Sequence, residues 1–158
     1  MIENPLGKTV SAPNRYNPDL LFPIPRIKER AKLPVFANGK VNGFDLWRAY
    51  ELSWLNECSR PEVRVAEFTF NSESDYLIES KSLKLYLNSL NGEKFKNEAD
   101  ISTRLISDLS SVSGYEIGLT LIPLDLIDRL QTNIVIGKSL DKNEGFDLAE
   151  KPDGSILK

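Results

Sequence analysis

The sequence contains no histidine, one cysteine and no long apolar run, and each absence excludes a class of structure or function. Without histidine, the chain lacks the commonest metal ligand and the commonest general base at neutral pH, so we assign no metal ligand. A single cysteine, Cys58, excludes an intramolecular disulfide. No stretch approaches the roughly 20 apolar residues of a membrane span, and the start, MIENPLGKTV, has no apolar signal core. We therefore expect a cytoplasmic protein.

The chain also lacks an excess of positive charge. Its formal net charge of −3 and pI near 5.1 disfavour broad electrostatic binding to nucleic acid or to an anionic membrane, which requires a basic face. Hydrophobic residues make up 41% and charged residues 27%, the balance of an ordinary folded protein. At 158 residues, the length suits one domain.

Proline is concentrated at the amino terminus, where residues 1–34 hold six of the nine. Because proline fixes its own φ and disfavours helix in the residue before it, we expect an extended arm over residues 1–34. The apolar stretch LLFPI at 20–24 is too rich for a solvated tail, so the arm should lie along the domain or a neighbouring subunit. The domain itself should span residues 35–140, and residues 141–158 form a polar tail that we expect to be loosely held.

Apolar periodicity predicts strands at both ends of the domain. Residues 44–55 alternate so that Leu46, Tyr50, Leu52 and Trp54 should share one face, with Arg48 as an interruption. Residues 62–70 form a second strand, and the turn composition between the two predicts an antiparallel hairpin. Residues 115–122 alternate again, 124–130 could form a short helical turn, and 132–140 could form a last strand paired with 115–122.

Two amphipathic helices should separate these strands. Leu83, Leu87 and Leu90 predict a helix over residues 81–90, with Ser80 or Glu79 at its amino end. A second helix should cover residues 98–112, which begin after the potential cap Asn97 and end before the helix stop Gly114. The fold class is therefore α+β, with two helices packed on one face of an antiparallel sheet of about four strands.

Residues 79–89, ESKSLKLYLNS, resemble the signature of the nitrile reductases that convert 7-cyano-7-deazaguanine to its 7-aminomethyl form with NADPH, in the biosynthesis of the tRNA nucleoside queuosine. Residues 20–26, LLFPIPR, and 45–56, DLWRAYELSWLN, resemble the amino-terminal module of the long, two-module form of that family. The resemblance covers the chain from about residue 6 to 136. It implies the tunnelling fold, in which modules pair and form a ring, and hence a homo- or hetero-oligomer.

The family's reaction begins when a cysteine thiolate adds to the nitrile carbon, and an aspartate and a His-Glu pair assist. The chain departs from that pattern, because alignment through Pro61 places Leu55 at the thiol position and Glu62 at the aspartate position. The His-Glu pair falls at Lys96 and Asn97. Cys58 lies three positions beyond the thiol position, where it is either an incidental turn residue or a nucleophile without histidine or clustered cations other than Arg60. We assign no catalytic residue and expect the chain alone to be inactive.

The resemblance assigns ligand contacts to the signature helix, in a site completed by the thiol-bearing second module. Glu79 and Ser80 would bind the base, because a carboxylate accepts from the N–H groups of a guanine-like ring and the helix start offers donors. Lys81, Ser82 and Lys84 would contact NADPH, the lysines at its phosphates. We expect the Glu79 carboxylate to stand at a module boundary without a local partner. The alternative is that Glu79 is an ordinary helix cap.

The chain ends near the point where the second module of the long form would begin. An expressed fragment, a split-gene subunit and a stand-alone copy without a catalytic partner are all compatible with the sequence. Two further functions also remain open: a non-catalytic binding or scaffold protein of the same fold, and an unrelated α+β protein.

Overall fold

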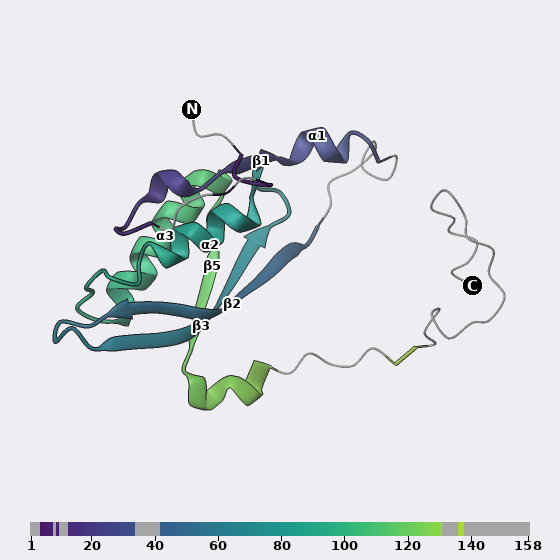
Figure 1. Ribbon diagram of the computed structural model, residues 1–158. Coiled ribbons are helices and arrows are strands. Elements are labelled where there is room, and N and C mark those ends of the chain that lie inside the picture. Colours follow the sequence, from purple (N-terminus) through teal and green to yellow (C-terminus); the bar gives the residue numbers. More distant parts are fainter. Residues whose placement is uncertain (1–3, 8, 10–12, 34–41, 131–135, 138–158) are drawn as a thin grey trace.

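The computed structural model describes residues 4–7, 9, 13–33, 42–130 and 136–137 (Figure 1). They form a mixed α+β structure with two antiparallel sheets and two main helices. The predicted fold class is confirmed at that level. The predicted strand at 132–140 and the tail at 141–158 lie outside the described residues.

The larger sheet has three antiparallel strands in the order β2-β3-β5. Strand β2, Phe44–Leu55, has its predicted bounds, and β3, Pro61–Asn71, is two residues longer than expected. Strand β5, Gly118–Ile122, is shorter than the predicted 115–122. The segment before it leaves the sheet, because the Ile117 amide donates to Ser110 Oγ at 3.0 Å and the Ile117 side chain is buried.

A bulge in β2 corrects the predicted faces of this strand. Ala49 pairs with Ala66 and Leu52 pairs with Arg64, so Tyr50 and Glu51 together oppose one residue of β3. The extra residue shifts the alternation by one position, because successive side chains point to opposite faces. Leu52 and Trp54 are buried as expected. Leu46 and Tyr50, predicted on the same face, are 46% and 56% exposed instead.

Helices α2, Ser80–Asn88, and α3, Glu98–Ser113, confirm the two predicted helices to within two residues. The Asn97 side chain accepts from the Asp100 amide, which satisfies one of the unpaired donors at the start of α3. Gly114 ends α3 in the left-handed region at φ 75°. A β-carbon there would lie 3.0 Å from Asp75 Oδ2, so both the dihedral angle and the space favour glycine.

The amino-terminal arm contains three short elements, so it is not extended throughout as predicted. They are the 3₁₀ turn η1, Pro18–Leu20, the strand β1, Pro23–Pro25, and the helix α1, Arg26–Arg30. Strand β1 pairs antiparallel with β4, Tyr76–Ile78, in a second, two-stranded sheet. The expectation that the arm packs on the domain is confirmed, because Leu21 is buried in the core.

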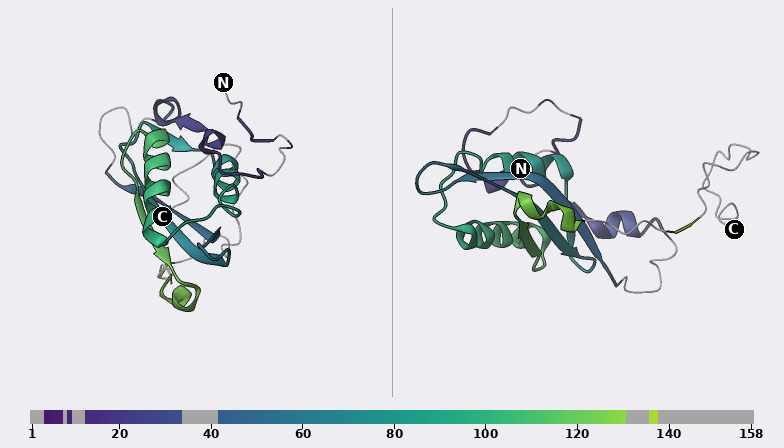
Figure 2. Two further views of the ribbon diagram at one scale, coloured as in Figure 1. Left: turned by 90° about the vertical axis from the view of Figure 1, so that its left-hand side faces the viewer. Right: turned by 90° about the horizontal axis from the view of Figure 1, so that it is seen from below.

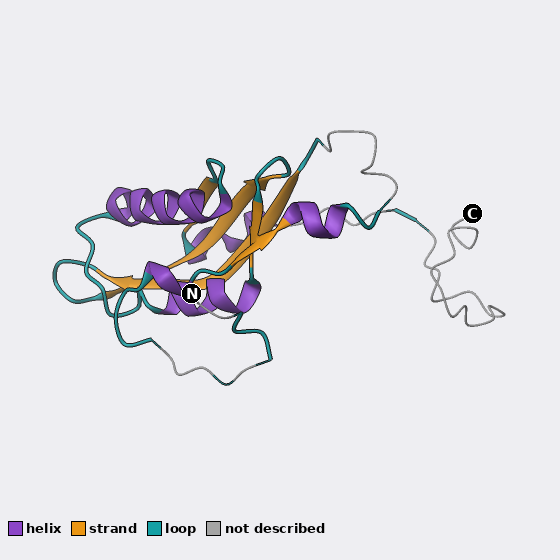
Figure 3. Ribbon diagram, turned by 90° about the horizontal axis from the view of Figure 1, so that it is seen from above, coloured by secondary structure: helices purple, strands orange, loops and turns teal. Residues whose placement is uncertain are grey.

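The core lies between the three-stranded sheet and helices α2 and α3. Trp54, Phe68 and Leu52 from the sheet join Tyr86 and Leu105 from the helices in one cluster of buried side chains. Both helices therefore cover the same sheet face, as predicted. Figures 2 and 3 show the helices and the strands from further directions. The turn η3, Leu124–Leu130, follows β5 away from these helices (Figure 1) and confirms the predicted helical turn.

Candidate functional site

Glu79 is the amino-terminal cap of α2. Its carboxylate accepts from the Lys81 amide at 2.9 Å and from the Ser82 amide at 2.7 Å, and the residue is 3% exposed. The expectation of a carboxylate without a local partner is therefore wrong, and the cap alternative holds. The physical reason is the helix amino terminus, whose unpaired amides and positive dipole end attract the nearest carboxylate. Because Glu79 takes these two amides, the helix start does not offer them to an external anion.

Ser82 lies in the interior rather than at a surface. It is fully buried, its hydroxyl donates to the Glu79 carbonyl at 2.6 Å, and it accepts from the Phe22 amide at 3.0 Å. The hydroxyl therefore joins helix α2 to the arm. Its predicted contact with a cofactor is not tested by these contacts, but it would require the arm to move away.

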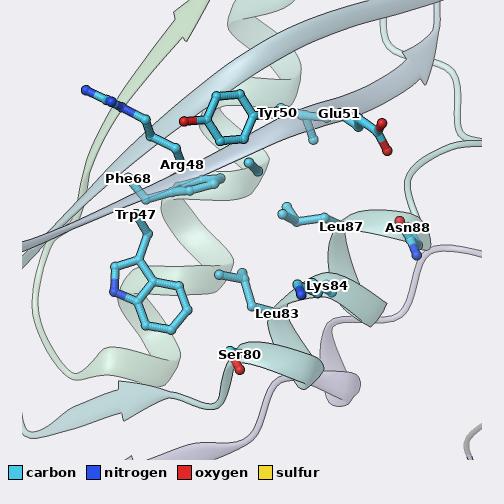
Figure 4. Close-up of a pocket in the computed structure, with 12 residues that line it drawn as sticks. Trp47, Arg48, Tyr50, Glu51, Phe68, Ser80, Leu83, Lys84, Leu87 and Asn88 are labelled. Atoms are coloured by element: carbon cyan, nitrogen blue, oxygen red, sulfur yellow. The ribbon is translucent and has the colours of Figure 1, made fainter. Parts of the chain in front are cut away.

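A pocket of about 400 Å³ lies between α2 and the bulged part of β2 (Figure 4). Leu83 and Leu87 of α2 face Trp47 and Phe68 of the sheet and form an apolar floor. The rim is polar and is formed by Ser80, Lys84, Asn88, Tyr50 and Glu51. An apolar cavity with a few polar groups at its mouth is the usual form of a small-molecule site.

The pocket brings together only some of the residues to which the resemblance assigned ligand contacts. Ser80 and Lys84, one helical turn apart, both line it and both are exposed. Lys81 points elsewhere, because its Nζ donates to the Pro5 carbonyl of the arm at 3.2 Å. Sequence reasoning missed Trp47 and Tyr50 as lining residues, because the bulge that directs them could not be located from the alternating pattern.

Arg48 contributes little charge to the pocket, although it lies on its wall. Its guanidinium forms an ion pair with Glu67 at 2.6 Å and donates to the Leu130 carbonyl at 3.2 Å, so it links the outer sheet face to η3. The hydrogen bond to Glu67 raises the pKa of Arg48. In Figure 4 this side chain points away from Leu83 and Lys84. Lys84 is therefore the exposed cation at the mouth of the pocket.

Three of the four positions that the resemblance assigns to nitrile chemistry hold structural residues. Leu55 exchanges backbone hydrogen bonds with the loop after α2, donating to the Glu93 carbonyl and accepting from the Phe95 amide. The Glu62 carboxylate accepts from Asn56 Nδ2 at 3.0 Å, and Asn97 caps α3. None of these three side chains supplies a thiol, a free general acid or an imidazole.

Cys58 is exposed at the tip of the β2–β3 hairpin. The turn is held by Asn56, whose Oδ1 accepts from the amides of Cys58 and Arg60 at 3.0 Å each. Ser59 occupies the left-handed region at φ 60°. The backbone of Cys58 thus has a defined role in the turn. These contacts favour Cys58 as a turn residue over Cys58 as a nucleophile.

A second polar cluster, absent from the sequence predictions, joins the arm to both helices. The hydroxyls of Tyr16 and Tyr86 both donate to Asp108 Oδ2, at 2.7 Å and 2.6 Å. Burial, and then the bond to Asp108, raise the pKa of both tyrosines. Arg104 lies over the Tyr16 ring, 5.2 Å from its centroid. The cluster could not be predicted from the sequence, because Tyr16 and Asp108 are 92 positions apart.

Within the described part of the chain, no group of three potential ligands among Asp, Glu, Cys and His lies close enough to hold a metal ion. Over the same residues, no helix is both long and apolar enough to cross a membrane.

The chain is similar to a known protein family and to several of its members. The family model described as "Nitrile reductase, 7-cyano-7-deazaguanine-reductase N-term" matches residues 12–121. A protein from Bordetella parapertussis named NADPH-dependent 7-cyano-7-deazaguanine reductase is 43% identical over 138 residues, which are 87% of this chain and 50% of that protein. Proteins of the same name from Dechloromonas aromatica and Teredinibacter turnerae are 48% and 39% identical, over 77% and 97% of this chain.

The chain spans about half the length of the curated relatives it matches, 50% of the Bordetella protein and 54% of the Teredinibacter protein. The matched family model describes an amino-terminal part. The similarity therefore concerns one module of a longer enzyme.

Proposed function

Because this chain belongs to the family of NADPH-dependent 7-cyano-7-deazaguanine reductases, as the counterpart of their amino-terminal module, we propose that it supplies ligand contacts to a nitrile reductase whose thiol is carried by a second module. The observation that carries this proposal is the pocket between α2 and β2, which opens beside the signature helix. Membership of the family excludes an unrelated α+β protein.

Glu79 and Ser80 are proposed to bind the 7-deazaguanine base. A carboxylate offers about four lone-pair positions. Two local amides and the Ser80 hydroxyl, at 3.4 Å, leave acceptor capacity for the N–H edge of a guanine-like ring. Since Glu79 is 3% exposed, the base must reach it at the edge of α2, beside the exposed Ser80. The apolar floor formed by Leu83 and Phe68 would exclude water from one side of the ligand.

NADPH would supply hydride to the nitrile-derived carbon, and Lys84 is proposed to hold its phosphate charge. The residues present fit that role in part: the ammonium of Lys84 lies exposed at the pocket mouth, whereas two of the helix-start amides, those of Lys81 and Ser82, are already taken by Glu79. Lys81 could contribute only after leaving the Pro5 carbonyl. We propose Ser82 as a structural residue of this site, because its hydroxyl is committed within the chain.

The catalytic thiol, the aspartate and the His-Glu pair are proposed to come from the second module, covalent or separate. The corresponding positions here are Leu55, Glu62, Lys96 and Asn97. Leu55, Glu62 and Asn97 make hydrogen bonds within this module. The tunnelling fold and a ring of modules are part of the same proposal. It is supported by β2, whose outer edge makes, within the described residues, only the single bridge from Leu55 to Lys94.

A non-catalytic binding or scaffold protein of the same fold is the second candidate function. It is favoured by the absence of histidine and by the leucine at the thiol position. In that case the pocket would hold a deazaguanine or another partner without reduction.

Reconstitution separates the two functions. The full chain is mixed with a thiol-bearing second module, and NADPH oxidation is followed with 7-cyano-7-deazaguanine as substrate. We expect turnover that requires both polypeptides. If the second module binds this chain and the mixture still shows no substrate-dependent oxidation above that of the second module alone, the scaffold function is correct.

A further inference from the structure

We propose that a buried polar face, formed by Ser82 and Tyr86 of α2 and by the C-cap residue Ser89, is the docking site of the amino-terminal arm, and that the docked arm positions Glu79. Ser82 is then a positioning residue for Glu79 and not a contact of the cofactor. The docking of the arm is inferred from the structure alone. The positioning of Glu79 rests on the proposed role of Glu79 in binding the base.

Two serines two turns apart repeat the same pair of hydrogen bonds. Ser82 accepts from the Phe22 amide at 3.0 Å and donates to the Glu79 carbonyl at 2.6 Å. Ser89 accepts from the Asn17 amide at 3.2 Å and donates to the Tyr86 carbonyl at 2.6 Å. Seven positions correspond to about two helical turns, so both hydroxyls lie on one face of α2. The arm therefore runs antiparallel to α2, along its whole length.

These bonds also argue against a phosphate contact at Ser82. A serine hydroxyl has one donor, and Ser82 already gives it to the Glu79 carbonyl. A phosphate at neutral pH offers acceptors, so it would have to compete for that donor in a fully buried position. The remaining lone pair suits an amide, which is what the arm provides.

Tyr86 lies between the two serines and helps to hold Tyr16 of the arm against the helices. Its hydroxyl and that of Tyr16 converge on the same oxygen of Asp108, so one carboxylate joins the arm, α2 and α3. Tyr86 is fully buried, and the two tyrosine rings pack in a T-shaped arrangement with centroids 6.3 Å apart. The Tyr16 amide adds a bond to Glu93 Oε1 at 3.0 Å, just beyond the end of α2.

The docked arm reaches Glu79 through the backbone. The Glu79 amide donates to the Phe22 carbonyl at 2.9 Å, while the Phe22 amide donates to Ser82. Pairing of Pro23 with Ile78 continues this contact into the β1–β4 sheet. Glu79 is thus held on the helix side by its carboxylate and its carbonyl, and on the arm side by its amide. Loss of the arm releases the restraint on the amide.

The first test measures arm docking in the full chain by amide hydrogen exchange. Ser82→Ala should speed exchange at Phe22, and Ser89→Ala should speed exchange at Asn17, each by about fivefold, the factor for loss of one net hydrogen bond. The matched control is Ser102→Ala, because Ser102 donates to the Glu98 carbonyl in the same way without touching the arm. Arm exchange that is equal in all three variants and the parent would overturn the docking site.

The second test is a double-mutant cycle on affinity for 7-cyano-7-deazaguanine, measured with the thiol-bearing module present. Ser82→Ala should weaken binding by about fivefold in the parent and have no further effect in a Glu79→Gln background, because it acts through Glu79. Ser89→Ala provides the same comparison from the far end of α2 should Ser82→Ala not fold.

The outcomes separate the two proposals. Equal weakening by Ser82→Ala in both backgrounds overturns positioning and leaves the arm as a general structural element. Unchanged affinity in Glu79→Gln alone overturns the proposed function of Glu79 and, with it, the positioning half. The exchange experiment still decides the docking half in that case.

Discussion

Replacing Glu79 with glutamine should destabilise the module, because the carboxylate closes the amino end of α2. Its two oxygens accept from two different amides, at 2.9 Å and 2.7 Å, in a position that is 3% exposed. A glutamine side chain has one acceptor oxygen, so one buried amide loses its partner, which costs about 1–3 kcal/mol. Loss of the negative charge at the helix dipole adds about 0.3–1 kcal/mol.

We therefore expect the free energy of unfolding to fall by roughly 2 kcal/mol, which corresponds to about 4–8 °C in Tm for a chain of this size. Urea titration followed by the fluorescence of Trp47 and Trp54 measures it, with an unchanged m value. Glu57→Gln is the control, because Glu57 is exposed in the hairpin turn and its change should stay within about 0.5 kcal/mol. If Glu79→Gln unfolds at the parent midpoint, the carboxylate does not cap α2.

Three further predictions concern the pH dependence of stability, the backbone conformation of Gly114 and the charge of Lys84. Burial first, and then the hydrogen bond to Asp108, raise the pKa of Tyr86 in the folded protein. The contribution of the neutral phenol to the free energy of unfolding is therefore complete below about pH 10. It is lost as the pH rises further, by up to about 1.4 kcal/mol per pH unit. Tyr86→Phe should flatten that slope in urea titrations across pH, and an unchanged slope would contradict the assignment. Gly114→Ala should cost about 1–2 kcal/mol in chemical denaturation, because of its φ of 75° and the approach of Asp75; a neutral result would contradict this. Lys84→Gln should raise the KM for NADPH in the reconstituted enzyme by about tenfold, whereas Lys28→Gln on α1 should not; equal effects would remove Lys84 from the site.

The helices were predictable because their signals are local. Asn97 and Gly114 mark the ends of α3 through interactions with residues within four positions. Leu83 and Leu87 place α2 through a period that any amphipathic helix shows. Neither inference requires knowledge of distant contacts, and both helices were found to within two residues.

The faces of β2 were not predictable, because a bulge depends on the partner strand. The alternation in residues 44–55 is continuous in the sequence, and only the pairing of Ala49 and Leu52 with β3 reveals the inserted residue. The pocket wall at Trp47 and Tyr50 follows from that bulge. The motif therefore indicated only the α2 side of the candidate site, and the β2 side could not be predicted.

The contacts of the polar residues in and just after α2 could not be predicted from the sequence. Lys84 and Ser80 line the pocket, whereas Ser82 and Ser89 bind an arm that precedes them by 60 and 72 positions. A serine in a helix carries no sequence signal that separates a ligand contact from such a distant structural one. Glu79 was similarly ambiguous, and its local cap only became evident from the structure.

The most direct test of the account is to find which cysteine forms the covalent adduct with the nitrile. The chain and a thiol-bearing second module are incubated with 7-cyano-7-deazaguanine without NADPH, and each polypeptide is analysed by intact mass and peptide mapping. The account predicts a thioimide adduct on the second module, in an amount unchanged by Cys58→Ser in this chain. An adduct on Cys58, formed by this chain alone, would contradict it and would make the hairpin turn the catalytic site.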